Sequence, residues 1–404
     1  MDKTLLQMLA LLRSSLWGTE RYPLEVYADI NWEDLYKELK DQTVNRLVAD
    51  ILCSLNTPVS NQCLQDTTRG MMGWHKIMKE QQNLYELLSS NNIPFVVLKG
   101  AVACINYPKP YYRSMGDIDI IVDPADFKHT SEVLENNGYE LCLSGSRHIS
   151  FSHNGIEIEV HRYYSLKTDK AQFELLEGLI QKGIPTATEA HIEGYKFPML
   201  STCENGLVFL EHIDHHLQDG IGLRHIVDWM MYVDRHVTDT MWKNMLGPYT
   251  ERLGLKTMAV VVTRMCQMYL GLSEDIEWCK DADPELCTDL MNVILARGNF
   301  GRKAKDANAI SHVLHSTSNV FGTFRMLQYR GTVNWKLLET HSYLKPFAWL
   351  YQICRYIHKG FKVKNPIRSL IKKAKSTSEE RRIFDKLGAT KKSDGIETPD
   401  GKQY

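Results

Sequence analysis

The stretch Arg113-Ser-Met-Gly-Asp117-Ile-Asp119-Ile-Ile-Val122 decides the fold, because it places two carboxylates at alternate positions of an otherwise apolar strand. Side chains at positions i and i+2 of a strand point to the same face, with roughly 7 Å between their Cα atoms, so Asp117 and Asp119 project together. Two negative charges side by side at the end of a buried strand are unfavourable unless a cation lies between them. A pair of oxygen ligands favours a hard cation, and we expect Mg²⁺ or Mn²⁺.

The residues before this strand predict an anion site. The segment 93–98, Ile-Pro-Phe-Val-Val-Leu, is typical of a short buried strand, and it runs directly into Lys99 and Gly100. A helix is expected to follow from Ala101 to about Tyr107. A strand, a glycine and the start of a helix place free backbone N–H groups and the positive end of a helix dipole at one point, which favours phosphate binding.

A third carboxylate is expected from the segment 155–161, Gly-Ile-Glu-Ile-Glu-Val-His. Its residues alternate strictly, so that Glu157, Glu159 and His161 lie on one face and three apolar residues lie on the other. A strand of this kind can supply a further acid to a site on a neighbouring strand.

In these residues the chain resembles the polymerase-beta-like nucleotidyltransferase superfamily, whose signature is a strand ending in a glycine before a helix, then an Asp-x-Asp strand, then one acid on a further strand. More narrowly, it is similar to a bacterial group usually described only as an uncharacterised nucleotidyltransferase family. The resemblance covers about residues 60 to 240. The elements that carry it, in chain order, are Leu98-Lys99-Gly100, Arg113 to Asp119, Glu159-Val160-His161, His212 with His216, and Leu223-Arg224 with Asp228.

The resemblance implies a metal-dependent transfer of a nucleoside monophosphate from a nucleoside triphosphate, such as ATP, to an acceptor hydroxyl or phosphate. Asp117, Asp119 and Glu159 would be the catalytic residues and the metal ligands. Glu159 is preferred as the third acid because it stands two residues before a histidine, and Glu157 is the alternative because it shares the same face. The acceptor is expected to be a small molecule. RNA or protein is the alternative, as in toxin relatives of the superfamily.

Lys99, Gly100 and Arg113 are expected to bind the nucleotide, since a guanidinium and an ammonium both suit phosphate oxygens. Alternatively, Arg113 only neutralises the aspartates as a structural ion pair. One position departs from the superfamily pattern, because Gly100 is followed by Ala101 where a serine or a second glycine usually holds the phosphates. The missing hydroxyl leaves a catalytically degenerate protein that only binds a nucleotide as a further alternative.

Six polar residues are expected at the rim of the active site: Glu157, His161, His212, His216, Arg224 and Asp228. His212 and His216 lie one helical turn apart, a spacing that also suits zinc. However, no glutamate follows His212 in the H-E-x-x-H manner, and no cysteine is spaced nearby. We therefore expect a helix that packs against the sheet, with these two histidines at the rim.

Length and composition exclude several classes of protein. The chain has 404 residues, 43% of them hydrophobic, and 48 Lys and Arg residues against 49 Asp and Glu residues, so no net charge steers it toward nucleic acid or membranes. Its nine cysteines form no C-x-x-C pair, which argues against a disulfide framework or a zinc site. No apolar run reaches the roughly 20 residues that a membrane-spanning helix needs, and no signal peptide is expected. A soluble, cytoplasmic protein is the expectation.

The apolar periodicity predicts an α+β fold, in which a small mixed β-sheet core is flanked by N-terminal and C-terminal helical regions. We expect an N-terminal helical region at 1–92, a nucleotidyltransferase core at 93–200, a C-terminal helical domain at 201–358 and a basic, partly disordered tail at 359–404. The lysine-rich stretch from Lys359 to Arg382 could bind RNA or an anionic membrane surface through its local positive charge.

Three segments of the C-terminal half carry specific expectations about secondary structure. Helices are expected from Asp239 to Leu253 and from Trp335 to Ile357. The segment from Lys182 to Ser201 contains two prolines and is expected to be a connection with a short strand.

Overall fold

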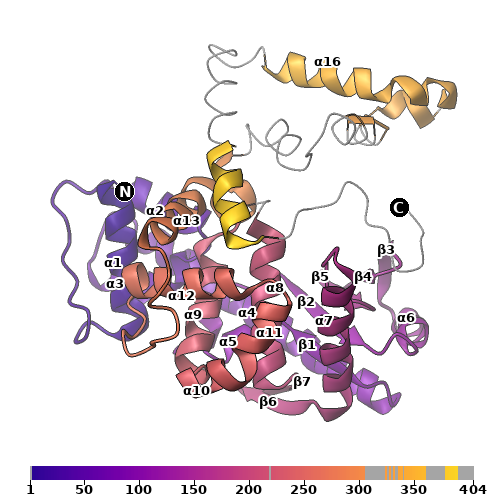
Figure 1. Ribbon diagram of the computed structural model, residues 1–404, viewed down its shortest axis with the longest axis horizontal. Helices are drawn as coiled ribbons and strands as arrows, with labels where there is room; N and C mark the ends of the chain where they lie inside the picture. The colour runs from indigo at the N-terminus through magenta and orange to yellow at the C-terminus, as the bar shows by residue number, and fades with distance from the viewer. Residues whose placement is uncertain are drawn as a thin grey trace.

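The computed structural model describes residues 2–217, 220–304, 335–339, 341–360 and 378–389, with a few single residues between 324 and 332 (Figure 1). Helices form both ends of this part of the chain, and a five-stranded sheet lies between them in the sequence. The α+β class, with a small mixed sheet flanked by helices, is therefore confirmed.

In the described residues before the sheet, long stretches carry apolar residues at helical spacing and form α-helices. The helices are α1 (Lys3–Trp17), α2 (Trp32–Asp41), α3 (Ala49–Ser54) and α4 (Ser60–Ser90). α2 begins after Asn31, whose side chain accepts hydrogen bonds from the backbone N–H groups of Glu33 and Asp34. α4 buries one face, with Trp74 and Met78 almost fully enclosed in the hydrophobic core.

The five-stranded sheet has the strand order β1-β2-β5-β4-β3. Its strands are β1 (Phe95–Leu98), β2 (Asp117–Val122), β3 (Glu140–Ser144), β4 (His148–His153) and β5 (Ile156–His161). β2 and β5 run parallel, whereas the other neighbouring strands run antiparallel. The parallel pair is possible because helix α6 (Phe127–Asn136) and the β3–β4 hairpin provide a long connection from β2 to β5.

The parallel register of β2 and β5 decides which acids meet. Asp117 pairs with Glu157, and Asp119 pairs with Glu159. The apolar residues between these acids are buried on the opposite face of the sheet. On the other side of β2, Leu98 pairs with Asp119, so the chain leaves β1 beside the same carboxylate.

The chain becomes helical again after β5. The helices include α7 (Lys170–Gly183), α8 (Thr202–Leu217), α9 (Leu223–His236), α12 (Lys256–Leu270) and α13 (Pro284–Arg297). Between α7 and α8, a connection with one short strand was expected, and the chain forms a hairpin of β6 (Thr188–Ile192) and β7 (Tyr195–Met199) instead. The expected helix from Asp239 to Leu253 is divided into α10 (Asp239–Met241), a π-helical segment (Trp242–Leu246) and α11 (Gly247–Arg252).

The prediction of a helix from Trp335 to Ile357 is wrong for the first half of this segment. Two 3₁₀ segments, Lys336–Glu339 and Ser342–Phe347, precede α16 (Ala348–Gly360). Pro346 lies just before the start of α16, and its ring cannot donate a helical hydrogen bond. Figure 1 shows α16 apart from the main body.

A further helix at 378–387, which the sequence did not predict, packs against the main body. Phe384 and Leu387 are buried in the hydrophobic core. Glu380 forms an ion pair with Arg297 at the end of α13. Part of the expected tail is therefore folded.

The rest of the expected tail at 359–404 gives no structural result for the RNA prediction. Residues 361–377 and 390–404, which include most of the lysine-rich stretch, lie outside the described residues. RNA binding through this stretch stays a prediction.

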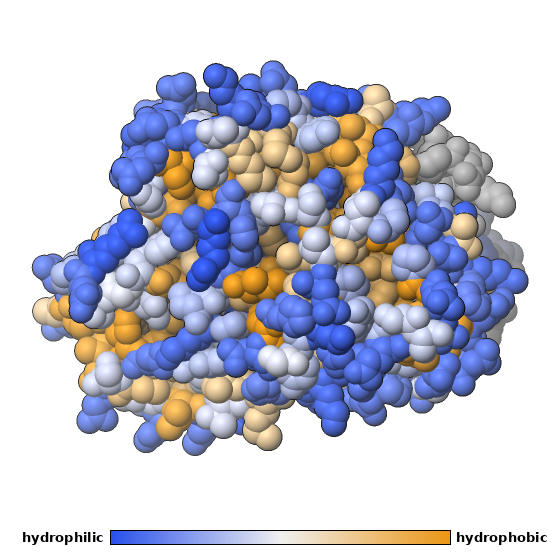
Figure 2. Space-filling view, turned by 90° about the horizontal axis from the view of Figure 1, so that it is seen from below, coloured by the Kyte–Doolittle hydropathy of each residue, from blue (hydrophilic) through white to orange (hydrophobic). Residues whose placement is uncertain are grey.

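One cluster of buried hydrophobic side chains runs through the N-terminal helices, the sheet and the helices from α7 to α13. No break in this packing marks the expected boundaries at residues 93 and 201, which stay predictions. On the face in Figure 2, exposed hydrophobic residues form several separate patches between hydrophilic ones. Within the described ranges, none of the helices combines the length and the apolar character that crossing a membrane requires.

Candidate active site

A cavity of about 810 Å³ lies where the ends of β2 and β5 face helices α8 and α9. Every site residue that the sequence predicted lines this cavity, except Asp228. Segments that lie far apart in the sequence are thus brought to one place. A volume of this order is typical of sites that enclose a small ligand such as a nucleotide.

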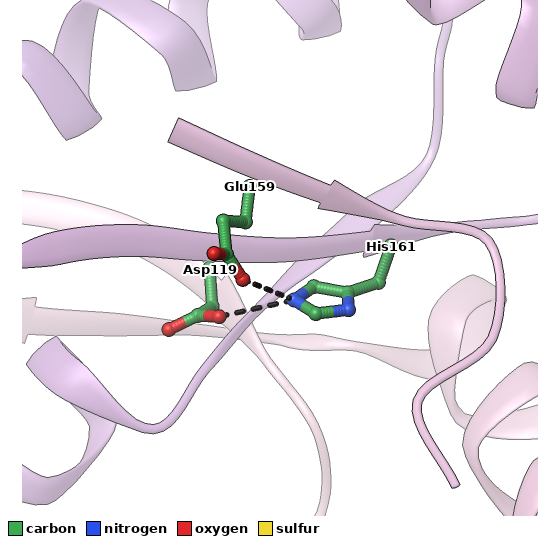
Figure 3. A group of neighbouring side chains, drawn as sticks. All are labelled: Asp119, Glu159 and His161. Carbon is green, nitrogen blue, oxygen red and sulfur yellow. Dashed lines mark hydrogen bonds and ion pairs between the residues drawn. The ribbon is translucent and has the colours of Figure 1, made fainter. Parts of the chain in front are cut away.

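Three side chains that could hold a metal ion meet at the floor of the cavity: Asp119, Glu159 and His161 (Figure 3). The Nε2 atom of His161 lies 3.0 Å from Oδ1 of Asp119 and 3.4 Å from Oε2 of Glu159. The three donor atoms lie within 4.8 Å of one another. Across the described ranges, no other group of this kind is found.

Lys99 holds Asp119 from the side of β1. Its ammonium nitrogen lies 2.9 Å from Oδ1 of Asp119. Burial opposes the charge of Lys99, but the negative charges of Asp119, Asp117 and Glu159 together outweigh burial and raise the pKa of this lysine. The backbone of Lys99 has a φ of 53° and a ψ of −122°, a conformation that residues other than glycine rarely adopt. The turn from β1 into α5 (Gly100–Cys104) therefore stores backbone strain at the cavity.

The two aspartates of β2 have opposite electrostatic environments. Burial alone would raise the pKa of Asp119, but Lys99 and His161 hold it well below its usual range. Asp117 opens to the cavity, and desolvation together with the negative charge of Asp119 raises its pKa. Burial also opposes the charged form of His161, but hydrogen bonds with Asp119 and Glu159 raise the pKa of this imidazole.

The donor set fits a divalent cation. Carboxylate oxygens suit Mg²⁺, and a set that includes an imidazole nitrogen also suits Mn²⁺. Burial and the negative charge of Asp119 together raise the pKa of Asp117, and a bound cation would favour its charged form. Of the three expected metal ligands, the structure brings Asp119 and Glu159 together with His161. Asp117 lies on the same face of β2 but outside this group.

Arg113 forms a buried two-point ion pair with Asp228 of α9. Its Nε and Nη2 atoms donate to the two carboxylate oxygens at 3.0 and 2.6 Å, and the hydroxyl of Tyr107 donates to the same carboxylate at 2.7 Å. The two charged side chains are 3% and 5% exposed. The sequence left open a phosphate ligand or a structural ion pair with the strand aspartates. The structure shows an ion pair with Asp228, and a phosphate contact stays a prediction.

A cluster of imidazole rings from α8 and α9 lies beside the cavity, and His212 and His216 line it. The ring of His212 lies 4.7 Å from that of His216 and 4.9 Å from that of His225, measured between centroids. Burial, with the positive charges of Lys99 and Arg224 nearby, lowers the pKa values of His212 and His225 well below their usual range. These three histidines do not form a metal-binding group among the residues that the structure describes. Of the rings that line the cavity, that of His212 is therefore flat and uncharged, which suits packing against a planar group.

The glycine that begins α5 faces the cavity, and the alanine that follows it does not. A Cβ at Gly100 would meet the side chain of Met115 at 3.5 Å, an ordinary contact, so protein packing does not require a glycine there. Ala101 is fully buried below the cavity floor. The expected role of Gly100 in admitting a phosphate stays a prediction.

The cavity also includes residues that the sequence did not single out. They are Thr43, Ser114, Met115, Gly116, Arg147, His148, Tyr163, Tyr164, Leu166, Glu211, His215 and Asn299. Some of them are next to predicted motif residues in the sequence, and this proximity could have been used to predict them. Thr43 and Asn299 come from regions before and after the motifs and carry no such signal.

Known proteins were compared with this chain as curated sequences, as solved structures and as family models. No curated protein matches the chain. A solved structure, described as an antigenic nucleotidyltransferase-like protein from Paracoccidioides brasiliensis, is similar with 18% sequence identity and a TM-score of 0.33, over 49% of this chain and 93% of that chain. A family model described as "Uncharacterised nucleotidyltransferase" matches residues 28–271, a range that includes every predicted site residue. The chain therefore belongs to this family of uncharacterised nucleotidyltransferases.

Proposed function

We propose that this protein is a metal-dependent nucleotidyltransferase, which moves a nucleoside monophosphate from a triphosphate such as ATP to a hydroxyl or phosphate of a small acceptor. The observation that carries the proposal is the meeting of Asp119, Glu159 and His161 at the floor of the 810 Å³ cavity, with Lys99 held against Asp119. Membership of the family supports nucleotidyl transfer. Placement in the polymerase-beta-like superfamily, a bacterial origin and a cytoplasmic location remain expectations from the sequence motifs and composition.

The acids of the two parallel strands would hold the metal ion. Asp119 and Glu159 are the first ligands, and Asp117 or His161 completes the set. When bound, Mg²⁺ or Mn²⁺ would neutralise the charge that develops on the phosphoryl group during transfer.

The side chains of the cavity position the reactants and accept a proton. Glu159 accepts the proton of the attacking acceptor hydroxyl. As the acceptor oxygen forms its bond to the α-phosphorus, the bond from this phosphorus to the bridging oxygen breaks, and pyrophosphate leaves with the bonding electrons. Lys99 keeps Asp119 ionised and fixed in place throughout.

Transfer of a radiolabel tests the proposal. The full chain is incubated with Mg²⁺ or Mn²⁺, with triphosphates labelled at the α-phosphate, and with pools of small-molecule, RNA and protein acceptors. We expect labelled product from the unmodified chain, and rates lower by at least about 100-fold from Asp119→Asn and Glu159→Gln. Glu157→Gln decides which glutamate is the third acid, and it is expected to have a smaller effect than Glu159→Gln.

Glu140→Gln is the matched control, because Glu140 is an exposed glutamate of the same sheet that does not line the cavity. Its transfer rate should equal that of the unmodified chain. Label in RNA or protein instead of a small molecule would favour the toxin-like alternative. Triphosphate binding without transfer to any pool would favour the degenerate alternative, and undiminished transfer by Asp119→Asn would overturn the proposal.

A further inference from the structure

Three arginines from distant parts of the chain meet at Ser114, three residues before Asp117. The Nε atom of Arg46 donates to the hydroxyl of Ser114 at 3.1 Å. The Nη1 atoms of Arg113 and Arg224 donate to the backbone carbonyl of Ser114 at 2.9 and 3.0 Å. Ser114, Arg113 and Arg224 line the main cavity, and Arg46 joins them through the hydroxyl of Ser114.

Only one of these arginines has a carboxylate partner within the described part of the chain. Asp228 pairs with Arg113, whereas no ion pair is found there for Arg46 or Arg224. Arg46 is only 7% exposed. Burial and the charges of the neighbouring arginines lower the pKa values of Arg46 and Arg224 to about 10, so both remain protonated at neutral pH. A buried positive charge without a counterion is unfavourable, and an anion would relieve it.

Polar atoms without partners lie at the same edge of the cavity. The hydroxyl of Thr43 and the Nε atom of Arg224 are buried and have no hydrogen-bond partner among the residues that the structure describes. Both residues line the main cavity. Thr43 also has a φ of 58°, which is rare for a β-branched residue. Buried donors of this kind are normally satisfied, so a ligand is the simplest partner for them.

The fold makes room for the guanidinium of Arg46. Gly70 lies within α4, and a Cβ at this position would lie 2.2 Å from Nη1 of Arg46. A second cavity of about 280 Å³ is lined by Arg46 and shares Thr43 with the main cavity. The arginine cluster therefore borders both cavities.

The arginine cluster and the proposed proton acceptor Glu159 lie at different levels along β2, and this difference suggests where the leaving group binds. It lies at Ser114, before Asp117, whereas Glu159 and His161 lie farther along, at the level of Asp119 and Ile121. In-line transfer puts the attacking oxygen and the leaving oxygen on opposite sides of the phosphorus. With Glu159 beside the attacking hydroxyl, the end of the cavity at Ser114 is available to the leaving pyrophosphate.

The cations that the sequence assigned to phosphate binding are already held by carboxylates. Asp119 holds Lys99, and Asp228 holds Arg113. We propose that Arg46, Arg224 and Thr43 bind the terminal phosphates of the triphosphate and the pyrophosphate that leaves. Guanidinium groups and a hydroxyl supply directed donors to phosphate oxygens, and the hydroxyl of Thr43 replaces the one missing at Ala101. This inference rests on the proposed function.

Calorimetric binding of inorganic pyrophosphate, ATP and AMP to the full chain in Mg²⁺ tests the inference. We expect Arg46→Met and Arg224→Met each to weaken the binding of pyrophosphate and of ATP by about 10-fold or more. The affinity for AMP should change much less. Gly70→Ala should weaken the binding of the same two ligands, because it displaces the side chain of Arg46 without removing its charge. Arg252→Met is the matched control, since Arg252 is exposed and lines neither cavity, and it should bind all three ligands as the unmodified chain does.

Unfolding in urea separates loss of binding from loss of folding. Arg46→Met removes a buried charge without a counterion, so its unfolding midpoint should equal or exceed that of the unmodified chain. Unchanged pyrophosphate affinity in both arginine variants overturns the inference, even when label transfer persists. Pyrophosphate binding that depends on both arginines, without label transfer by the unmodified chain, supports the anion site and contradicts the proposed function.

Discussion

Lys99 combines backbone strain with a buried charge, and substitution can separate the two. Its φ of 53° and ψ of −122° suit glycine, and a side chain in this conformation costs about 1–3 kcal/mol. Lys99→Gly and Lys99→Ala both remove the ammonium, so the difference between them reports the strain. We expect the glycine variant to resist urea better by about 1 kcal/mol, because its greater freedom in the unfolded chain offsets part of the relief. An alanine variant of equal or higher stability would show that the backbone is not strained.

Loss of one partner of the Arg113–Asp228 ion pair is expected to lower the free energy of unfolding strongly. Asp228→Leu leaves the guanidinium of Arg113 buried without its partner, and we expect a loss of about 3–5 kcal/mol in unfolding free energy. The double variant Arg113→Met, Asp228→Leu removes both charges and should recover most of this loss. Urea unfolding of the two single variants and the double variant measures the coupling. If the two losses simply add, the charges do not stabilise one another.

The buried carboxyl of Glu177 in α7 should make the free energy of unfolding depend on pH. Burial raises its pKa from 4.5 to about 7, against the opposing hydrogen bond from the backbone of Ser165. A carboxyl whose pKa is higher in the folded state favours folding below pH 4.5, and this stability is lost as the pH rises through 7. Glu177→Gln removes the effect. Between pH 4.5 and pH 8, the unfolding free energy of this variant should therefore rise relative to the unmodified chain by about 3 kcal/mol.

The control for this pH effect is Glu174→Gln in the same helix. Glu174 is exposed, with a side chain 63% accessible, and it pairs with the exposed Lys170. Its pH profile should follow that of the unmodified chain. Parallel profiles for Glu177→Gln and the unmodified chain would show that the carboxyl of Glu177 does not titrate near neutral pH.

At the scale of elements, the parallel pairing of β2 with β5 forms the site. Side chains alternate along each strand, so a slip of one residue would turn Glu159 and His161 away from Asp119. This alternation is local, and it allowed the sequence to predict which acids share a face. Which strand lies beside β2 was not predictable in the same way, because it depends on the path of the β3–β4 hairpin through space.

The helix at 378–387 should contribute to the stability of the main body. Leu387 is fully buried in the core, so Leu387→Ala is expected to cost about 2–5 kcal/mol in urea unfolding. Lys386→Ala is the control, because Lys386 is exposed on the same helix, and it should change stability by less than about 0.5 kcal/mol. Equal stability of the two variants would mean that this helix does not pack on the core in solution.

This helix also shows where prediction of elements from sequence fails. Its apolar residues fill barely one turn, at Ile383, Phe384 and Leu387, within a segment rich in charged residues. So short a pattern gives no helical period, and tertiary packing decides the outcome. Long amphipathic segments behave differently. The sequence predicts helices from Leu223 to Val237 and from Lys256 to Leu272, and α9 and α12 end within two residues of these bounds, because their apolar stripes extend over several turns.

At the scale of the whole molecule, the cavity depends on contacts between distant segments. Arg46 reaches Ser114 from the N-terminal helices, and Arg113 reaches Asp228 in α9. The acidic motif residues were assignable from the sequence, because strand alternation and the turn at Lys99 are local features. The partner of a buried arginine was not, because a basic residue carries no local sign of the carboxylate that it will meet.

Electron paramagnetic resonance of Mn²⁺ in the presence of ATP tests the central claim most directly, because it needs no knowledge of the acceptor. Titration of the unmodified chain and of Glu140→Gln should show Mn²⁺ and ATP bound together at one tight site. Asp119→Asn and Glu159→Gln should lose this site while their unfolding midpoints show that they remain folded. We predict a metal and triphosphate site at β2 and β5. It would be contradicted if Asp119→Asn and Glu159→Gln bound Mn²⁺ and ATP as tightly as the unmodified chain does.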